Sequence, residues 1–334
     1  MFTGLSAFPL TPMNEQGVDE GAFTRLVEQL VAAKVDSIGA LGSTGSYAYL
    51  SRIERSRVTQ LAVEAAGNVP VMVSIGSLRT RDVLLLAEDA QKAGVKALLL
   101  PPVSYQKLSA EDVFSLYETV TANISVPLCL YDNPGTTYFE FTDELHGRIA
   151  RLPNVHSMKI PGVPEAPDQA RARVDRLRAL SPEHVTIGVS GDAFAATGLN
   201  AGCEVWYSVI GGLFPKTALS ITRAALSGNA EEATRLSESL KPLWALFTQF
   251  GGSLRVVATA AELRGFTHSP SLPLPLRTIS GAGRQQIAAV IDELSSRPGI
   301  VRATGGRAIL DPRTRDRLRE RGRVVYLRTS VNQQ

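Results

Sequence analysis

The sequence predicts an α/β protein built as a (β/α)8 barrel, followed by a small α-helical region and a short basic tail. Short apolar or β-branched runs alternate with longer helical patterns eight times over about 225 residues, and residues 229–296 contain helical patterns only. An open doubly wound sheet usually has fewer strands. We therefore expect a barrel over residues 1–226, a helical region over 227–297 and a tail over 298–334.

Each expected strand is a run of four or five residues rich in Val, Ile, Leu and Ala. The strands are expected at 4–8, 37–40, 71–74, 97–100, 127–131, 155–159, 185–189 and 204–208. Between them, apolar residues recur every three or four positions, which is typical of amphipathic helices. The clearest helical segments are 19–34, 52–67, 78–94 and 109–123.

Composition places the chain among ordinary globular proteins. Of its 334 residues, 44% are hydrophobic and 20% are charged, which is enough to bury a large core. No apolar run reaches the ~18 residues of a membrane span, and the first residues lack the pattern of a signal peptide, so we expect a cytoplasmic protein with no membrane partner. Cys129 and Cys203 lie in separate apolar runs, which favours two buried thiols over a disulfide or a zinc site.

The net charge of +3 is unevenly distributed. Residues 298–334 contain nine arginines and three acidic residues, a balance of +6, which leaves −3 for residues 1–297. The main part of the chain also lacks a basic stretch with interleaved aromatic residues. Nothing there indicates nucleic-acid binding.

In a barrel of this kind the chemistry lies where the strands end. The stretch "NVHSMKIPG", residues 154–162, places Lys159 at the end of an apolar strand, whereas the other six lysines lie in helices or loops. Burial of an ammonium lowers its pKa, and the neutral amine can then attack a carbonyl to form a Schiff base. Two structural alternatives are a lysine that extends out of the barrel mouth and a lysine paired with a carboxylate such as Asp192.

The stretch "GSTGS", residues 42–46, follows another strand. Its backbone N–H groups and the hydroxyls of Ser43 and Thr44 could bind a carboxylate or phosphate. The alternative is a tight turn that needs positive φ at Gly42 or Gly45. The stretch lacks the Gly-Lys-Ser/Thr ending of a P-loop.

Tyr131 ends the stretch "VPLCLYDNPG". A phenol at a strand end can transfer a proton when a hydrogen-bond chain holds it, and Tyr105 and Thr44 are the expected members of that chain. The alternative is a tyrosine at the edge of the core with its hydroxyl at the surface.

The order of "GSTG", "PPVSYQKLSAEDV", "YDNPGTT", "MKIPG", "SGD" and "PLPLR" resembles the dihydrodipicolinate synthase and N-acetylneuraminate lyase superfamily, the class I pyruvate-dependent aldolases, over residues 1–297. The resemblance implies that Lys159 forms the Schiff base with pyruvate or a related 2-oxo acid. It implies that Ser43 and Thr44 hold the carboxylate, that Tyr131 transfers protons, and that Tyr105 enters the site of a neighbouring subunit.

Further expectations follow from the same resemblance. It implies an aldehyde as second partner, a homodimer or homotetramer, and a reaction that requires neither a metal nor an organic cofactor. The four histidines show no paired ligand spacing. The remaining substrate-binding residues are expected to be Gly42, Thr136, Ser190 and Trp206.

Two positions depart from the family pattern. Thr136 stands where the synthase of lysine biosynthesis carries an arginine that binds the second substrate, and Ser46 stands where a glutamate is common. We therefore expect a Schiff-base aldolase or dehydratase, with 4-hydroxy-tetrahydrodipicolinate synthase or a catalytically silent keto-acid binding protein as alternatives. A third hypothesis is a structural or interaction role centred on the basic tail.

The tail resembles part of a different family. Residues 303–331 are similar to a middle piece of shikimate kinase, although Arg307 interrupts its glycine triplet and the chain has no P-loop. We expect a non-catalytic remnant of a gene fusion or read-through, with a packing or partner-binding appendage as the alternative. Residues 312–321 are expected to be helical and 323–327 extended.

Overall fold

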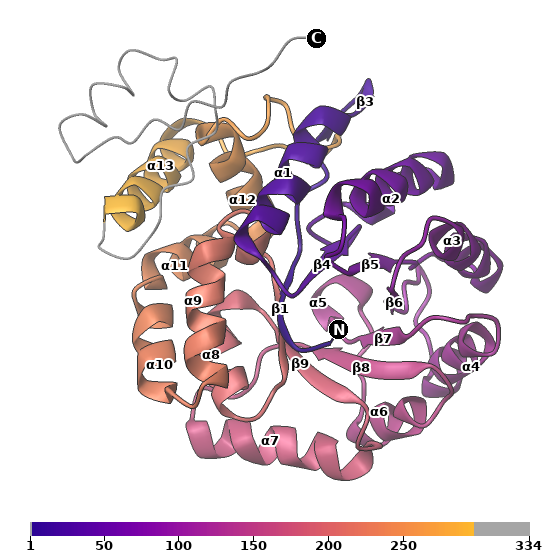
Figure 1. The fold of residues 1–334 in the computed structure, drawn as a ribbon. Helices are drawn as coiled ribbons and strands as arrows, with labels where there is room; N and C mark the ends of the chain where they lie inside the picture. Colours follow the sequence, from indigo (N-terminus) through magenta and orange to yellow (C-terminus); the bar gives the residue numbers. More distant parts are fainter. Residues whose placement is uncertain (1, 297–334) are drawn as a thin grey trace.

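Eight parallel strands close into a barrel in the computed structural model, which describes residues 2–296. Neighbours around the barrel follow chain order, and β1 pairs with both β4 and β10 to close it. Figure 1 shows the strands gathered at the centre of the molecule. The barrel strands are β1 (Gly4–Ala7), β4 (Ser37–Ala40), β5 (Val71–Ser74), β6 (Ala97–Leu100), β7 (Leu128–Tyr131), β8 (Val155–Ile160), β9 (Thr186–Ser190) and β10 (Val205–Ser208).

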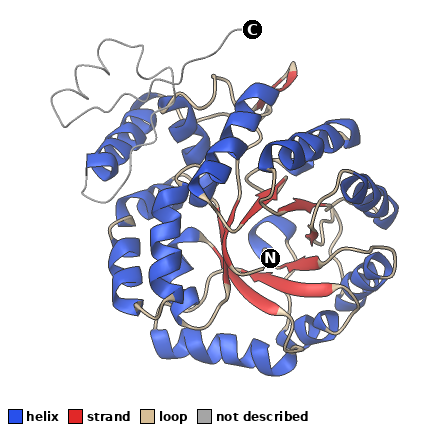
Figure 2. Ribbon diagram, in the orientation of Figure 1, coloured by secondary structure: helices blue, strands red, loops and turns tan. Residues whose placement is uncertain are grey.

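Helices surround the barrel, as the blue ring around the red strands in Figure 2 shows. The helices that follow the barrel strands are α1 (Glu20–Ala33), α2 (Arg52–Ala66), α3 (Thr80–Lys92), α4 (Ala110–Thr121), α5 (Pro134–Thr137), α6 (Asp143–Ala150), α7 (Pro167–Leu180), α8 (Ala195–Asn200) and α9 (Pro215–Leu226). The chain then forms α10 (Ala230–Glu238), α11 (Lys241–Gln249), α12 (Ser253–Leu263) and α13 (Gly281–Ser296). A small hairpin, β2 (Met13–Asn14) and β3 (Gly17–Val18), lies outside the barrel.

Local signals explain why the helices begin where they do. Ser51 and Ser109 each accept a hydrogen bond from a backbone N–H one turn ahead, and the acidic residues Glu54 and Asp112 bond back to them. These two capping boxes satisfy N–H groups that have no partner inside the helix. They fix the starts of α2 and α4.

The barrel strands separate two apolar layers. Side chains that alternate along each strand face either the surrounding helices or the barrel interior. The interior cluster contains Phe8, Leu99, Cys129, Tyr131 and Tyr207, together with four further buried residues. The larger cluster fills the space between the strands and the helices. Every second side chain along a strand therefore points toward the barrel axis. This alternation decides which residues reach the site.

The predicted fold class is confirmed. Three strands have the predicted bounds, and β9 begins and ends one residue later than expected. Both cysteines are buried free thiols. The division into a barrel, a helical region and a tail stays a prediction, and the expected helix and extended segment at 312–327 lie outside the described residues. Among the helices described here, none is long and apolar enough to cross a membrane.

Candidate active site

A cavity of about 1060 Å³ opens at the carboxyl ends of the barrel strands. The loops after the strands form one side of it, and α11 with the start of α12 forms the other. Six of the residues selected from the sequence line this cavity: Ser43, Thr44, Tyr131, Thr136, Lys159 and Ser190. The strand-end rule therefore brings together residues that are up to 147 positions apart in the chain.

Lys159 lies near the end of β8 and is only 5% exposed. It pairs in register with Tyr131 of β7, so both side chains point into the barrel from adjacent strands. Its Nζ lies 4.1 Å from the centre of the Tyr131 ring and 4.0 Å from the centre of the Phe8 ring. A lysine that extends out of the barrel mouth would be exposed, so that alternative is wrong.

Asp192 does not pair with Lys159 either. Its carboxylate accepts hydrogen bonds from the indole of Trp206, the hydroxyl of Ser208 and the backbone N–H groups of Val209 and Ile210, at 2.8–3.1 Å. Burial raises the pKa of Asp192 to about 6, and these donors oppose the shift. The carboxylate thus shapes the loop after β10. Within residues 2–296 no carboxylate forms an ion pair with Lys159.

The Tyr131 hydroxyl is held by two partners. It lies 3.2 Å from the Ser43 hydroxyl and accepts a hydrogen bond of 2.8 Å from the amide of Asn133. Burial raises the pKa of the Tyr131 phenol, but the charge of Lys159 and the hydrogen bonds outweigh burial, and the pKa is lowered overall. Tyr131 is therefore a buried phenol poised beside an amine, and its hydroxyl is not at the surface.

The hydrogen bonds of the Tyr131 hydroxyl in the described residues do not involve the two expected partners, Thr44 and Tyr105. Thr44 lines the cavity, but the hydroxyl that contacts Tyr131 belongs to Ser43. Tyr105 is 90% exposed on the loop after β6 and does not line the cavity of its own protomer. Within one chain, Ser43 and Asn133 take the places expected for Thr44 and Tyr105.

The glycines of the "GSTGS" stretch are needed for space. Positive φ falls on Leu41 and Ser46, so the alternative that placed it at Gly42 or Gly45 is wrong. A Cβ at Gly42 would lie 2.5 Å from the Phe8 ring, and one at Gly45 would lie 3.0 Å from the backbone of Leu41. Gly42 therefore lets the Phe8 ring approach, while Ser43 and Thr44 face the cavity.

The other expected substrate-binding residues differ in their placement. Thr136 is exposed at the rim on α5, and the Ser190 hydroxyl donates to the carbonyl of Ile160 at 2.9 Å. Trp206 is fully buried outside the cavity, because it occupies the opposite face of β10. Its neighbour Tyr207 points inward and lines the cavity. The residue of β10 that reaches the cavity is therefore one position after the predicted Trp206.

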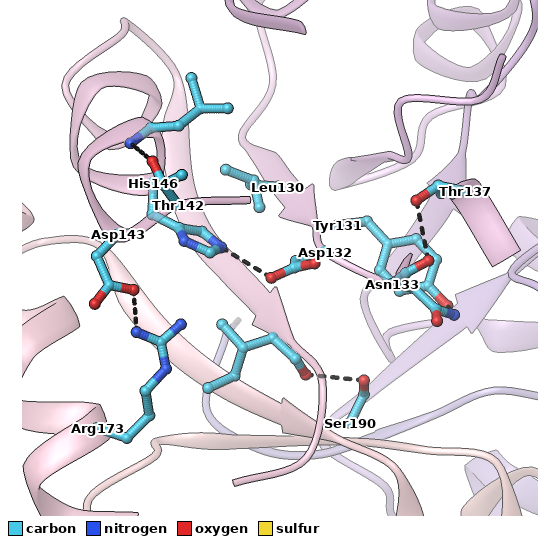
Figure 3. A network of polar contacts seen from close by, with 12 residues as sticks. Leu130, Tyr131, Asp132, Asn133, Thr137, Thr142, Asp143, His146, Arg173 and Ser190 are labelled. Atoms are coloured by element: carbon cyan, nitrogen blue, oxygen red, sulfur yellow. Dashed lines mark hydrogen bonds and ion pairs between the residues drawn. The ribbon is translucent and has the colours of Figure 1, made fainter. Parts of the chain in front are cut away.

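Sequence reasoning also missed a buried pair next to Tyr131. Asp132 lies 3.2 Å from Nε2 of His146, and both side chains are almost fully buried. Figure 3 shows Asp132 directed toward His146 and away from the side chains of Tyr131 and Asn133. The backbone N–H of Asp132 donates to the carbonyl of Lys159 at 2.9 Å. The pair joins the end of β7 to α6, and the backbone hydrogen bond joins it to β8, the strand that carries Lys159.

Comparison with known proteins agrees with this geometry. The model of the dihydrodipicolinate synthetase family matches residues 1–294. The chain belongs to this family. It is consequently a lyase of the dihydrodipicolinate synthetase family, as the sequence predicts. The model of the shikimate kinase family matches residues 282–334, which agrees with the resemblance noted for the tail.

Individual relatives cover most of the chain. A 4-hydroxy-tetrahydrodipicolinate synthase from Shewanella piezotolerans is 32% identical over 84% of this chain and 94% of its own length. The enzyme of the same name from Parvibaculum lavamentivorans is 32% identical over 86% of this chain and 96% of its own length. The crystal structure of dihydrodipicolinate synthase from Agrobacterium tumefaciens is 44% identical, with a TM-score of 0.84 over 88% of this chain and 98% of that one. The crystal structure of dihydrodipicolinate synthase from Thermotoga maritima is 26% identical in sequence, with a TM-score of 0.80 over 88% of this chain and 99% of that one.

Proposed function

We propose that the protein is a Schiff-base-forming lyase in which Lys159 condenses with the keto group of pyruvate or a related 2-oxo acid. The observation that carries this proposal is the buried amine of Lys159 at the cavity floor, in register with Tyr131. Such an amine can attack a keto carbon, and the protonated imine then withdraws electrons from the neighbouring carbon. A carbon–carbon or carbon–oxygen bond at C3 can then be made or broken.

The residues around Lys159 have distinct roles in this proposal. Tyr131 passes a proton between the reacting oxygen and the Ser43 hydroxyl, because its own hydroxyl touches that of Ser43 at 3.2 Å. Ser43 and Thr44 hold the carboxylate of the 2-oxo acid at the start of the loop that leads to α2. These roles need no group beyond those of the chain and its two substrates.

The second substrate is proposed to be an aldehyde that carries an anionic group. Lys159 and Arg255 are the cationic side chains that line the cavity, and Asp192, its acidic residue, is engaged by four donors. Arg255 is exposed on α12, and within residues 2–296 its guanidinium has no carboxylate partner. A guanidinium binds a carboxylate with two parallel hydrogen bonds. Arg255 thus supplies on α12 the group that Thr136 lacks.

We infer that the functional unit is a homodimer or homotetramer. Tyr105 is 90% exposed and does not contribute to its own cavity, which supports a role in the site of a neighbouring subunit. Mixing subunits that carry Tyr105→Phe with subunits that carry Lys159→Ala tests this, because mixed dimers recover one complete site if the tyrosine crosses over. No recovery would contradict it.

A 4-hydroxy-tetrahydrodipicolinate synthase is the second candidate, since curated relatives of that name are 32% identical. A panel of aldehydes with pyruvate distinguishes the two, because turnover of the semialdehyde of lysine biosynthesis alone would favour the synthase. A catalytically silent keto-acid binding protein would form the Schiff base and turn over none of the aldehydes. Two residues motivate this last alternative: Thr136 and Ser46, which is buried with its hydroxyl lacking a partner within residues 2–296.

A further inference from the structure

Three aromatic rings from three strand ends surround the amine of Lys159. Its Nζ lies 4.0 Å from the centre of the Phe8 ring, 4.1 Å from that of Tyr131 and 5.7 Å from that of Tyr207. A cation within about 6 Å of the centre of a ring is attracted by the negative potential of the ring face. We call Phe8, Tyr131 and Tyr207 the aromatic cage.

The Phe8 ring is fixed by two glycines. A Cβ at Gly39 would lie 2.4 Å from the ring, and one at Gly42 would lie 2.5 Å from it, so no larger residue fits at either position. The ring also meets Tyr207 edge to face, with 6.1 Å between centres and 85° between planes. Gly39 on β4 and Gly42 in the loop after it have no side chain, and the Phe8 ring occupies the space that this leaves beside the amine.

The Tyr207 ring is fixed in a similar way. A Cβ at Gly188 would lie 2.3 Å from its Cε2 atom. Its hydroxyl lies 2.6 Å from that of Ser157, and the thiol of Cys129 lies 3.4 Å from the same hydroxyl. Gly188 therefore leaves room for the Tyr207 ring, and the contacts of its hydroxyl with Ser157 and Cys129 fix the other end of the side chain.

Charged and titratable groups near the amine are few. The groups that face it are the phenols of Tyr131 and Tyr207 and the thiol of Cys129, whose pKa burial raises to about 11. The carboxylate of Asp192 accepts four other hydrogen bonds. In the described part of the chain, the ring faces are thus a fixed source of negative potential for a cation at this nitrogen, where no carboxylate forms an ion pair.

We propose that the aromatic cage stabilises the protonated imine formed on Lys159. The inference rests on the proposed function. The neutral amine of Lys159 attacks the keto carbon, so the bond from Nζ to that carbon forms. The carbon–oxygen bond then breaks, and the oxygen leaves as water with one nitrogen proton and one proton delivered through Tyr131. The positive charge therefore lies on Nζ, over the three rings. The cage therefore favours the protonated imine, which is the electron-withdrawing form, over the neutral imine.

Fluorination of Phe8 tests the cage, because fluorine removes electron density from the ring face and changes its size little. The full chain is prepared with mono-, di- and trifluorophenylalanine at position 8. Each variant is treated with pyruvate and cyanoborohydride, which reduces a protonated imine far faster than a neutral one, and labelling of Lys159 is followed against pH. We expect the upper midpoint of labelling to move stepwise to lower pH, by about 0.5 to 1 unit over the series.

Phe23 provides the matched control, since it is fully buried on α1 and belongs to the outer apolar layer. The same fluorinated residues at position 23 should leave the midpoint unchanged, and Tyr207→Phe, which keeps the ring, should preserve the fluorine dependence at position 8. A midpoint that does not move in the Phe8 series overturns the cage and leaves imine formation intact. Absence of any label at Lys159 in the unmodified protein, with borohydride as well as cyanoborohydride, overturns both proposals.

Discussion

The two walls of the cavity differ in kind. The barrel wall, formed by Ser43, Thr44, Tyr131 and Lys159, presents hydroxyls and an amine from strand ends that converge on one point. The helical wall, formed by Trp244, Phe247, Phe250 and Arg255, presents aromatic rings and one guanidinium from α11, α12 and their connection. The difference suggests a division of work, in which the barrel wall performs the chemistry on the 2-oxo acid and the helical wall selects the second substrate.

Replacement of Lys159 by alanine should have the largest effect. Without the amine no Schiff base can form, so we expect no detectable turnover and no adduct after borohydride reduction with pyruvate. Lys96→Ala is a matched control, because Lys96 is exposed immediately before β6, at the opposite end of the barrel from the cavity. Residual turnover in the Lys159 variant would show that the barrel wall does not work through an imine.

Tyr131→Phe should separate proton transfer from imine formation. Removal of a positioned proton-transfer group costs about a hundredfold to ten-thousandfold in turnover, whereas trapping of the pyruvate imine should persist. Because the pKa of Tyr131 is lowered, the tyrosine-dependent limb of the pH–rate profile should lie below pH 10, the ordinary value for a phenol, and should be absent from the variant. An unchanged profile would remove Tyr131 from the proposed mechanism.

Arg255→Gln tests the helical wall alone. Loss of a charge-assisted contact should raise the KM for an anionic aldehyde about tenfold to a hundredfold. The KM for pyruvate and the KM for uncharged aldehydes should not change. Arg25→Gln on α1, which also removes an exposed guanidinium, is the control and should change neither. An equal rise in the KM for anionic and for uncharged aldehydes would contradict the separate roles proposed for the two walls.

Deletion of residues 298–334 should have the smallest effect. The match to the dihydrodipicolinate synthetase family ends at residue 294, and both cavity walls lie before that point. We therefore expect unchanged turnover and unchanged melting temperature, measured on the same preparation. A loss of turnover with an intact melting curve would support the hypothesis that the basic tail has a role of its own.

Local patterns were sufficient to predict the barrel and to select Lys159 as a candidate, while its catalytic role rests on the family resemblance and stays a prediction. Apolar runs define strands within about one residue, and a lysine that ends such a run has to face either the interior or the mouth of the barrel. The error at Trp206 has a simple cause, since a side chain changes faces at every residue and the sequence alone did not fix the phase of β10.

Other features could not be predicted because they depend on distant segments. His146 on α6 meets Asp132, fourteen residues earlier in the chain, because α6 packs beside β8, the neighbour of β7 in the barrel. Arg255 reaches the cavity only because α12 folds back over the barrel mouth, and no motif marks it. Gly42 was recognised, but the reason for it, the ring of Phe8, lies more than thirty residues earlier.

Peptide mapping after borohydride reduction in the presence of pyruvate tests the central claim most directly. We predict a single carboxyethyl adduct on the peptide that contains Lys159, formed in the full chain and absent when pyruvate is omitted. An adduct confined to another lysine, or aldehyde turnover without any trapped adduct, would contradict the account.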